Sequence, residues 1–180
     1  MRECTSAATR DPLDFYRTPD AAVLAILPYL PVSGTILEPA SGDGAIVRVL
    51  RSVGIPHERI YAVEIEPERA CVSSAYCRTD VADFLQWSAP RRFDLIIANP
   101  PYREAQKFIE KAVDVGSTVA MLLRLGFLES KKRYPFHHKH PSDVFVFSRR
   151  PRFTGRKQSY PAAFAWFVWG PGRGNNWSLL

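Results

Sequence analysis

The stretch Thr35-Ile36-Leu37-Glu38-Pro39-Ala40-Ser41-Gly42-Asp43-Gly44, residues 35–44, decides the fold of this chain. It begins as a short apolar strand, ends in a turn with two glycines, and runs directly into an amphipathic helix over 44–53. Glycine lets the backbone turn tightly and approach a ligand without a Cβ in the way. A glycine turn between the first strand and the first helix of an open α/β sheet is typical of a nucleotide-binding crevice. The alternative for Asp43 and Gly44 is an ordinary helix cap.

Strand and helix patterns alternate along the chain on both sides of this turn. Further strands are expected over 60–65, 77–79, 93–98 and 118–125, with helices over 22–30, 67–75 and 104–115, a helical turn over 81–87 and a short helix within 126–142. This alternation predicts the α/β class, with a Rossmann-like, doubly wound and mostly parallel sheet. The strands expected over 143–148 and 163–169 have no helix between them, so we expect an antiparallel hairpin at the sheet edge.

The start of the first helix carries a capping signal. Thr18 is expected to be its N-cap, with Pro19 at the first helical position.

Length and composition indicate one domain over residues 1–180. Apolar content of 46% and charged content of 23% are ordinary for a globular protein in water. We expect neither a membrane span nor a signal peptide. Cys4, Cys71 and Cys77 have no zinc-ligand spacing and are expected to be free thiols. Together these features predict a cytoplasmic protein.

Charge is divided unevenly along the chain. Residues 1–102 carry 10 Lys and Arg against 13 Asp and Glu, whereas residues 103–180 carry 14 against 5. A basic half predicts a polyanionic partner, with nucleic acid first, although a solvated basic surface without a partner is the alternative. The candidate nucleic-acid contacts are Lys131, Lys132, Arg133, Arg149, Arg150, Arg152, Arg156 and Lys157.

Acidic residues surround the expected crevice. Glu64 ends the second strand, 20 residues after Gly44, where a carboxylate can accept hydrogen bonds from ribose hydroxyls. Glu38 and Asp43 would repel a pyrophosphate but suit a cationic ligand with an amino group and a sulfonium. S-adenosylmethionine is a ligand of this kind.

A second stretch, Asp94-Leu95-Ile96-Ile97-Ala98-Asn99-Pro100-Pro101-Tyr102, ends a buried strand in a polar corner. Two prolines remove two backbone donors and stop the strand. A plain turn would explain the prolines, but it gives no reason for Asn99 before them or Tyr102 after them.

The order of these motifs resembles that of the S-adenosylmethionine-dependent DNA N6-adenine methyltransferases in their gamma arrangement. The resemblance rests on these segments: Phe15-Tyr16-Arg17-Thr18-Pro19, Glu38-Pro39-Ala40-Ser41-Gly42-Asp43-Gly44, Val63-Glu64-Ile65-Glu66-Pro67, Asp83-Phe84-Leu85 and Asn99-Pro100-Pro101-Tyr102. It covers most of the chain, and the chain looks like the small stand-alone enzymes of phages and prophages. It implies S-adenosylmethionine as cofactor, S-adenosylhomocysteine as product, and a location in the bacterial host cytoplasm if the protein is phage-encoded.

The resemblance also implies roles for individual residues around the cofactor. Tyr16, Thr18 and Pro19 would close over its methionine end, and Glu38 with Pro39 and the loop of Ser41, Gly42, Asp43 and Gly44 would hold the amino-acid part. Glu64 would hold the ribose, and Ile65 beside it is a further candidate for cofactor binding. Asp83 would bind the adenine amine while Phe84 packs on the ring; Asp80 is the rival, and both acids could instead cap a short helix.

The corner at Asn99, Pro100, Pro101 and Tyr102 would perform the chemistry in this resemblance. The Asn99 side-chain oxygen and the Pro100 carbonyl would each accept an N–H bond from an adenine amine. Tyr102 would stack on a base flipped out of the duplex. Phe153 is the candidate for the opposite face of the base, with a place in the core as its alternative.

Several alternatives stay open. The same chemistry could act on adenine in RNA or on a protein glutamine, and a non-catalytic nucleic-acid-binding module is the alternative from another class. The partner is expected to be DNA, duplex or single-stranded, with the choice between monomer and homodimer undecided. We expect no metal site at His137-His138-Lys139-His140, because Lys interrupts the histidines.

We also expect no separate target-recognition domain. Two basic loops over 126–142 and 149–162 can supply only a few base contacts, so short or relaxed sequence preference is predicted.

Overall fold

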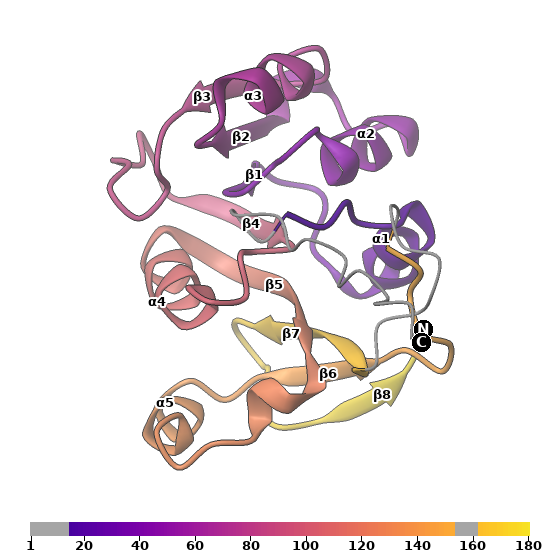
Figure 1. The fold of residues 1–180 in the computed structure, drawn as a ribbon, viewed down its shortest axis with the longest axis vertical. Helices are drawn as coiled ribbons and strands as arrows, with labels where there is room; N and C mark the ends of the chain where they lie inside the picture. Colours follow the sequence, from indigo (N-terminus) through magenta and orange to yellow (C-terminus); the bar gives the residue numbers. More distant parts are fainter. Residues whose placement is uncertain (1–14, 154–161) are drawn as a thin grey trace, which may run out of the picture.

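The computed structural model describes residues 15–153 and 162–180 of the chain, and shows an eight-stranded sheet with helices on both faces (Figure 1). The strand order is β3-β2-β1-β4-β5-β7-β6-β8. Pairing is parallel from β3 to β5 and between β6 and β8, and antiparallel where β7 joins β5 and β6. The predicted α/β class is therefore confirmed, with a mostly parallel sheet and antiparallel strands near the C-terminal end.

The strands are β1 Ile36–Glu38, β2 Ile60–Glu64, β3 Arg78–Val81, β4 Phe93–Ala98, β5 Gly116–Arg124, β6 Asp143–Val146, β7 Phe164–Trp169 and β8 Trp177–Leu179. The α-helices are α1 Asp20–Ile26, α2 Ala45–Ser52, α3 Pro67–Ser73, α4 Ala105–Val115 and α5 Tyr134–Lys139. Short 3-10 turns cover Leu27–Tyr29, His57–Arg59 and Leu125–Leu128. No helix within the described residues combines the length and the apolar character needed to cross a membrane.

The sheet buries apolar side chains on both faces, because successive strand residues point to opposite sides. In β4, Leu95 and Ile97 join the core beneath α1 and α2, whereas Ile96 and Ala98 join the core beneath α4 and α5. The aromatic strand β7 divides in the same way, with Trp166 on the first face and Trp169 on the second. Both indoles are almost fully buried, so they serve sheet packing.

The topology places a crevice at the carboxyl end of β1. Strand β1 lies between β2 and β4, so the chain continues from it first to one side of the sheet and later to the other. Loops that leave such a switch point in opposite directions open a ligand site between them. The glycine turn after β1 and the Asn-Pro-Pro-Tyr corner after β4 therefore meet at the carboxyl ends of these two neighbouring strands.

The predicted Thr18 cap is wrong. The N-cap of α1 is Pro19, with ψ of 137°, and no side chain caps the helix. Pro19 itself accepts the first backbone bonds, from Ala22 at 2.9 Å and from Val23 at 3.4 Å. The extended ψ of Pro19 keeps it out of the first helical position, so Pro19 is itself the flanking residue and the helix begins at Asp20 rather than at Pro19.

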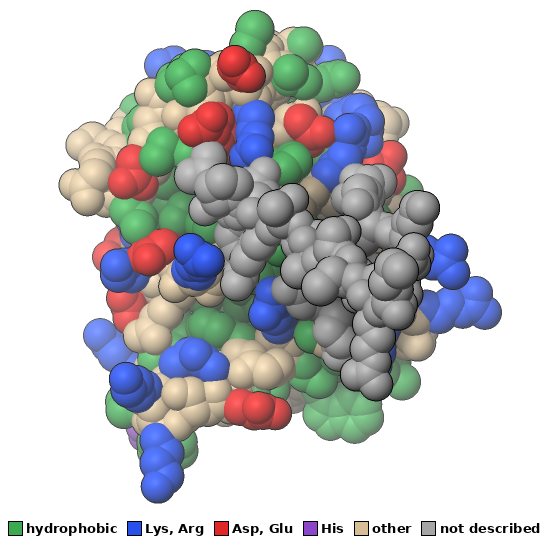
Figure 2. Space-filling model, viewed as in Figure 1, with side chains coloured by type: hydrophobic (Ala, Val, Ile, Leu, Met, Phe, Trp, Pro, Cys, Tyr) green, Lys and Arg blue, Asp and Glu red, His purple; other side chains and the backbone are tan. Residues whose placement is uncertain are grey.

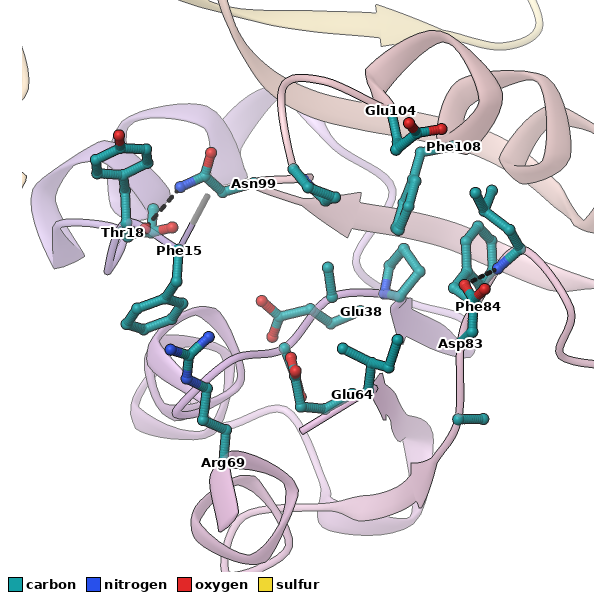
Figure 3. Close-up of a pocket in the computed structure, with 18 of the residues that line it drawn as sticks. Phe15, Thr18, Glu38, Glu64, Arg69, Asp83, Phe84, Asn99, Glu104 and Phe108 are labelled. Carbon is teal, nitrogen blue, oxygen red and sulfur yellow. Dashed lines mark hydrogen bonds between the residues drawn. The ribbon is translucent and has the colours of Figure 1, made fainter. Parts of the chain in front are cut away.

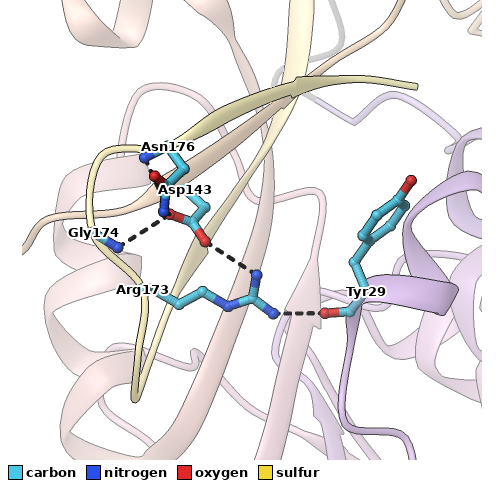
Figure 4. Close-up of polar contacts among 5 residues, drawn as sticks. All are labelled: Tyr29, Asp143, Arg173, Gly174 and Asn176. Atoms are coloured by element: carbon cyan, nitrogen blue, oxygen red, sulfur yellow. Dashed lines mark hydrogen bonds and ion pairs between the residues drawn. The ribbon is translucent and has the colours of Figure 1, made fainter.

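The predicted edge position of the last two strands is also wrong. β6 and β7 do pair antiparallel, but β8 adds beside β6 and forms the edge in their place. The Asp143 carboxylate at the start of β6 accepts hydrogen bonds from the backbone N–H of Gly174 at 3.1 Å and of Asn176 at 3.2 Å (Figure 4). It also pairs with Arg173 at 3.1 Å, and Arg173 donates to the Tyr29 carbonyl at 2.6 Å. One buried acid thus holds the segment that leads into β8.

Candidate active site

A pocket of about 530 Å³ opens at the carboxyl ends of β1, β2 and β4. This volume lies within the range of small-molecule and cofactor sites. Figure 3 shows Phe15, Thr18 and Asn99 at one end of it, Asp83, Phe84 and Phe108 at the other, and Glu38 and Glu64 between them. The predicted cofactor residues that line it are Tyr16, Thr18, Glu38, Pro39, Ser41, Asp43, Glu64, Ile65, Asp83 and Phe84. Three other predicted residues, Pro19, Gly42 and Gly44, do not line it.

The glycine turn is shaped by backbone angles and by one carboxylate. Gly42 and Gly44 have φ of +53° and +76°, a backbone region that residues with a side chain rarely adopt. A Cβ at Gly42 would lie 2.3 Å from a ring carbon of Phe15. Glu64 accepts the Gly42 N–H at 2.6 Å with one oxygen and the Glu66 N–H at 3.0 Å with the other. The end of β2 therefore holds the turn that follows β1, and Phe15 rests on the space that the missing side chain leaves.

The pocket floor is acidic. Glu38 is buried and accepts the Val47 N–H at 3.1 Å. Burial raises the pKa of Glu38 well above its ordinary value; the Val47 hydrogen bond opposes this, and the nearby Glu64 and Asp43 carboxylates add to the rise. Asp43 pairs with Arg17 at 2.8 Å. A cationic group placed here would offset the desolvation and the mutual repulsion of these acids.

Two polar atoms in the pocket wall are free to bond a ligand. Ser41 Oγ and Asp43 Oδ1 are buried, and neither has a hydrogen-bond partner among the described residues. Buried polar atoms are normally paired, so an unpaired one in a pocket wall fits a donor or acceptor on a bound molecule. Their side chains line the cavity from the turn that follows β1.

Asp83 and its rival Asp80 differ in whether they face the far end of the pocket. Asp80 does not line the cavity, and its carboxylate accepts the Trp87 indole N–H at 3.0 Å. Asp83 lines the cavity and accepts the Leu85 N–H at 2.9 Å, which stabilises a turn rather than a regular helix. Phe84 packs 5.2 Å from Phe108, which comes from α4. The geometry therefore favours Asp83 over Asp80 as the acid that faces a ligand.

The corner after β4 places the Asn99 amide in one orientation. Its Nδ2 donates to the Tyr16 carbonyl at 2.9 Å, and its Oδ1 accepts the Tyr102 hydroxyl at 2.8 Å. Asn99 and Pro101 line the pocket, whereas Pro100 is buried and Tyr102 does not line it. Asn99 thus stands at the pocket wall, with Tyr102 outside this cavity.

The predicted basic contacts differ in how exposed they are. Lys131, Lys132, Arg149, Arg150 and Arg152 are exposed, and Figure 2 shows Lys and Arg gathered in the lower left of the view, where Figure 1 places α5. Arg133 is half-buried and donates to the carbonyls of Phe127 and Glu129. Most of its hydrogen-bonding capacity therefore closes the turn before α5. Arg156 and Lys157 lie outside the described residues.

Phe153 and the histidines have packing roles in the described structure. Phe153 is buried, 4.8 Å from Phe164 and 6.4 Å from Tyr16, as its core alternative requires. The His137 ring lies 3.1 Å from the Phe127 carbonyl, and the His140 ring packs on Phe136. Within residues 15–153 and 162–180, no group of three or more His, Cys, Asp or Glu could hold a metal ion.

Several pocket residues were not predicted as site residues. Phe15 and Arg17 flank Tyr16, and the Arg69 guanidinium lies 4.1 Å from the centre of the Phe15 ring. Glu104 and Phe108 lie one helical turn apart near the start of α4, and both line the cavity. The available signal was their position beside the motifs: in the segment before α1, and in the helix that follows the Asn-Pro-Pro-Tyr corner.

Two curated proteins are similar to part of this chain. The type II methyltransferase M.TthHB8I of Thermus thermophilus is 41% identical over 81 residues, 43% of this chain and 19% of its own length. The type II methyltransferase M.CvrRI of Paramecium bursaria Chlorella virus XZ-6E is 39% identical over 69 residues, 37% of this chain and 18% of its own length. The similarity thus spans less than half of this chain and about a fifth of each relative. No protein-family model matches the chain.

Three solved structures share the fold. A protein of Pyrococcus horikoshii assigned as an RNA methyltransferase superposes with a TM-score of 0.70 at 16% identity, covering 88% of this chain and 87% of that one. A Listeria monocytogenes protein assigned as a class I S-adenosylmethionine-dependent methyltransferase gives 0.68 at 12% identity, covering 91% and 65%. The methyltransferase subunit of a type I restriction-modification system of Streptococcus thermophilus gives 0.63 at 13% identity, covering 88% and 45%.

These likenesses agree with the resemblance of the motifs, at the level of the fold for the whole described chain and at the level of sequence for part of it. The chain has the fold of the class I S-adenosylmethionine-dependent methyltransferases, and part of its sequence is related to type II methyltransferases.

Proposed function

We propose that this chain transfers a methyl group from S-adenosylmethionine to the N6 amine of adenine in DNA. The observation that carries the proposal is the Asn99 amide, held in one orientation at the wall of an acidic pocket. The part of the sequence shared with type II methyltransferases supports it. So does the shared fold.

The residues of the pocket fit this cofactor. Glu38 and Asp43 would supply negative charge for the amino group of the cofactor's amino-acid end. Arg17, which pairs with Asp43, would meet the carboxylate of the cofactor. Each carboxylate oxygen of Glu64 accepts one backbone N–H and keeps a second lone pair, which can accept a hydrogen bond from a ribose hydroxyl. Ser41 Oγ has no partner among the described residues and would gain one here.

The other end of the pocket suits a purine. Asp83 can accept from an exocyclic amine, and Phe84 and Phe108 provide apolar surface for a ring. When bound, S-adenosylmethionine supplies an electrophilic methyl group on a positively charged sulfonium.

Asn99 would activate the acceptor amine from the pocket wall. The lone pair of an adenine N6 amine is delocalised into the ring, so the free amine is a weak nucleophile. An N–H bond accepted by Asn99 Oδ1, and a second accepted by the Pro100 carbonyl, would draw the nitrogen toward tetrahedral geometry. The same fixed dipoles would stabilise the positive charge that develops on it. Alignment of the two groups would contribute much of the rest of the rate.

The target base has to leave the double helix to reach this corner, and Tyr102 would provide an aromatic surface beside Asn99. The exposed Lys131, Lys132, Arg149, Arg150 and Arg152 would contact phosphates. Phosphate contacts bind DNA and RNA alike, so the choice of DNA rests on the related type II methyltransferases rather than on the basic surface.

The test is methyl transfer from labelled S-adenosylmethionine to separate pools of duplex DNA, single-stranded DNA, RNA and protein, followed by nucleoside and amino-acid analysis. We expect label in N6-methyladenine from DNA. Asn99→Ala should abolish transfer while cofactor affinity changes little, and Gln106→Ala, a half-buried amide of α4 that does not line the pocket, is the matched control. Label in RNA or in glutamine would replace the proposed substrate. Activity of Asn99→Ala within tenfold of the unmodified chain would disprove the assigned role of Asn99.

A further inference from the structure

Side chains of Tyr16, Arg124 and Phe164 pack around the ring of Tyr102, and the Phe164 ring is tilted by 48° with centroids 5.8 Å apart. The Tyr16 ring stacks on it with centroids 6.0 Å apart and an angle of 17° between the planes. The Arg124 guanidinium lies 5.1 Å from the Tyr102 centroid. Arg124 ends β5, which pairs directly with β4, and this pairing brings it to the corner after β4 although 22 residues separate it from Tyr102.

A base that stacks on Tyr102 needs the place that one of these groups occupies. Aromatic partners stack with centroids about 4.5–7 Å apart, so the guanidinium already stands at the distance that a base would take. A planar cation over an aromatic face is a favourable contact in its own right. A base that stacks on Tyr102 where the guanidinium stands can therefore enter only after Arg124 has moved.

Displacement of Tyr16 would disturb the proposed active site itself. The Tyr16 carbonyl accepts the Asn99 amide N–H, its ring meets the edge of Phe153, and it lines the cofactor pocket. Departure of its ring would open the pocket wall. Arg124 is half-buried at the end of a strand, and its guanidinium sits on a long stem with several rotatable bonds.

We propose that Arg124 is a specificity-determining residue that holds the base-stacking face of Tyr102 until a nucleotide arrives, and then pairs with a phosphate of that nucleotide. The inference rests on the proposed function, since it takes adenine in DNA as the arriving group. A nucleotide that has rotated out of the duplex keeps a phosphate on either side of its sugar. A side chain displaced from the base face therefore has an anion close by.

Electrostatics favours this destination. Methyl transfer from a sulfonium to an amine places positive charge on the nitrogen, so a guanidinium held against the base would raise the energy of the transition state. Paired with a phosphate, the guanidinium is neutralised, and its planar fork matches the phosphate oxygens. A free base brings no phosphate, so for a free base Arg124 is only an obstacle.

The test compares two ligands that differ in phosphate. One is deoxyadenosine; the other is a duplex oligodeoxynucleotide with an adenine opposite an abasic site, where flipping costs little. Binding is measured with the cofactor pocket saturated by S-adenosylhomocysteine, so that deoxyadenosine cannot occupy it. In Arg124→Ala we expect deoxyadenosine to bind about 2- to 30-fold more tightly, the factor that corresponds to removal of one cation–π interaction. We expect the duplex to bind more weakly, with its log–log salt slope reduced by about 0.9 for one neutralised phosphate.

Arg91→Ala, which removes an exposed cation just before β4, at the opposite end of that strand from Asn99, should leave the affinity for both ligands unchanged. Thermal unfolding and S-adenosylhomocysteine affinity report whether the variants are folded, and Arg124→Met keeps the apolar stem if Arg124→Ala is not. If Arg124 had only a structural role, Arg124→Ala would bind both ligands more weakly. Weaker binding of both ligands would therefore overturn the inference. So would tighter binding of both ligands, an unchanged affinity for deoxyadenosine, or an unchanged salt slope for the duplex. These binding assays need no methyl transfer, so they can fail or succeed independently of the labelling test of the proposed function.

Discussion

The Tyr102 hydroxyl donates a hydrogen bond to Asn99 Oδ1 over 2.8 Å, while the Asn99 amide nitrogen donates to the Tyr16 carbonyl over 2.9 Å. The amide is bonded at both ends, and the Tyr16 carbonyl fixes its orientation, because a flipped amide would place the Asn99 oxygen, an acceptor, against that carbonyl oxygen. Under the proposed function, this pair of bonds presents the Asn99 oxygen to the target amine before the base arrives. Three residues from two separate segments thus prepare one acceptor.

Tyr102→Phe removes one of these bonds and keeps the ring for stacking. We expect kcat to fall about fivefold, as for the loss of a hydrogen bond worth about 1 kcal/mol, with little change in KM. Steady-state kinetics on the methylated substrate measure the split. Tyr134→Phe, on a ring that is 70% exposed, is the matched control. An unchanged kcat, or a change in KM alone, would remove the positioning role from the Tyr102 hydroxyl.

Glu64→Gln tests the link between β2 and the glycine turn. The substitution keeps an acceptor but loses the charge that receives Gly42 N–H and would receive the ribose hydroxyls. We expect S-adenosylmethionine to bind about 1–3 kcal/mol more weakly, the range for charge-assisted hydrogen bonds. Calorimetry gives the affinity, and Glu66→Gln, two residues away and outside the pocket, is the control. Equal affinity in Glu64→Gln and the unmodified chain would show that another group holds the ribose.

Glu38 should make cofactor binding depend on pH. Its pKa is raised in the free chain, chiefly by burial, and a bound cation would favour the carboxylate and lower that pKa. Binding should therefore release a proton, and affinity should increase as pH rises toward the raised pKa. Calorimetry in buffers of different ionisation enthalpy detects the proton. Glu38→Gln should abolish the release, and proton uptake on binding would contradict the expectation.

Asp143→Asn tests the contacts that hold the segment before β8. The pKa of Asp143 lies below its ordinary value: burial raises it, but hydrogen bonds from Gly174, Arg173 and Asn176 lower it by more. A lowered pKa means that this carboxylate stabilises the fold above the pKa of the unfolded chain, and that the stabilisation is lost as pH falls through the folded pKa. We expect Asp143→Asn to lower the free energy of unfolding by about 1.5–3 kcal/mol at neutral pH. The difference from the unmodified chain should shrink in acid, and a difference independent of pH would contradict this account.

Arg149, Arg150 and Arg152 are exposed in the segment that follows β6. Replacing all three with Gln should weaken DNA binding and reduce the slope of log affinity against log salt by about 0.9 for each phosphate that the chain no longer neutralises. Arg91→Gln removes an exposed cation just before β4, at the opposite end of that strand from Asn99, and should leave the slope unchanged. An unaltered slope in the triple variant would place the DNA on another surface.

The sequence by itself determined the elements and motifs that depend on near neighbours. Strand β4 has the predicted bounds, Phe93–Ala98, because its apolar run and the prolines after it are local properties. Gly42 and Gly44 have the positive φ that their place in the turn requires, and Glu64 stands at the end of β2 beside them. Ten of the predicted cofactor residues line one pocket, because the carboxyl ends of parallel strands meet at one edge of the sheet.

Only the tertiary structure decided which distant side chains meet. The Arg124 guanidinium reaches Tyr102 because β5 pairs with β4, and Phe153 is buried by Phe164 and Tyr16. β8, with all three residues exposed, has no buried apolar pattern and exists through pairing with β6 and the hydrogen bonds to Asp143. Local periodicity reports burial and turns, which neighbouring residues share. Pairing partners and side-chain contacts across the sheet depend on packing between segments that are far apart in the sequence.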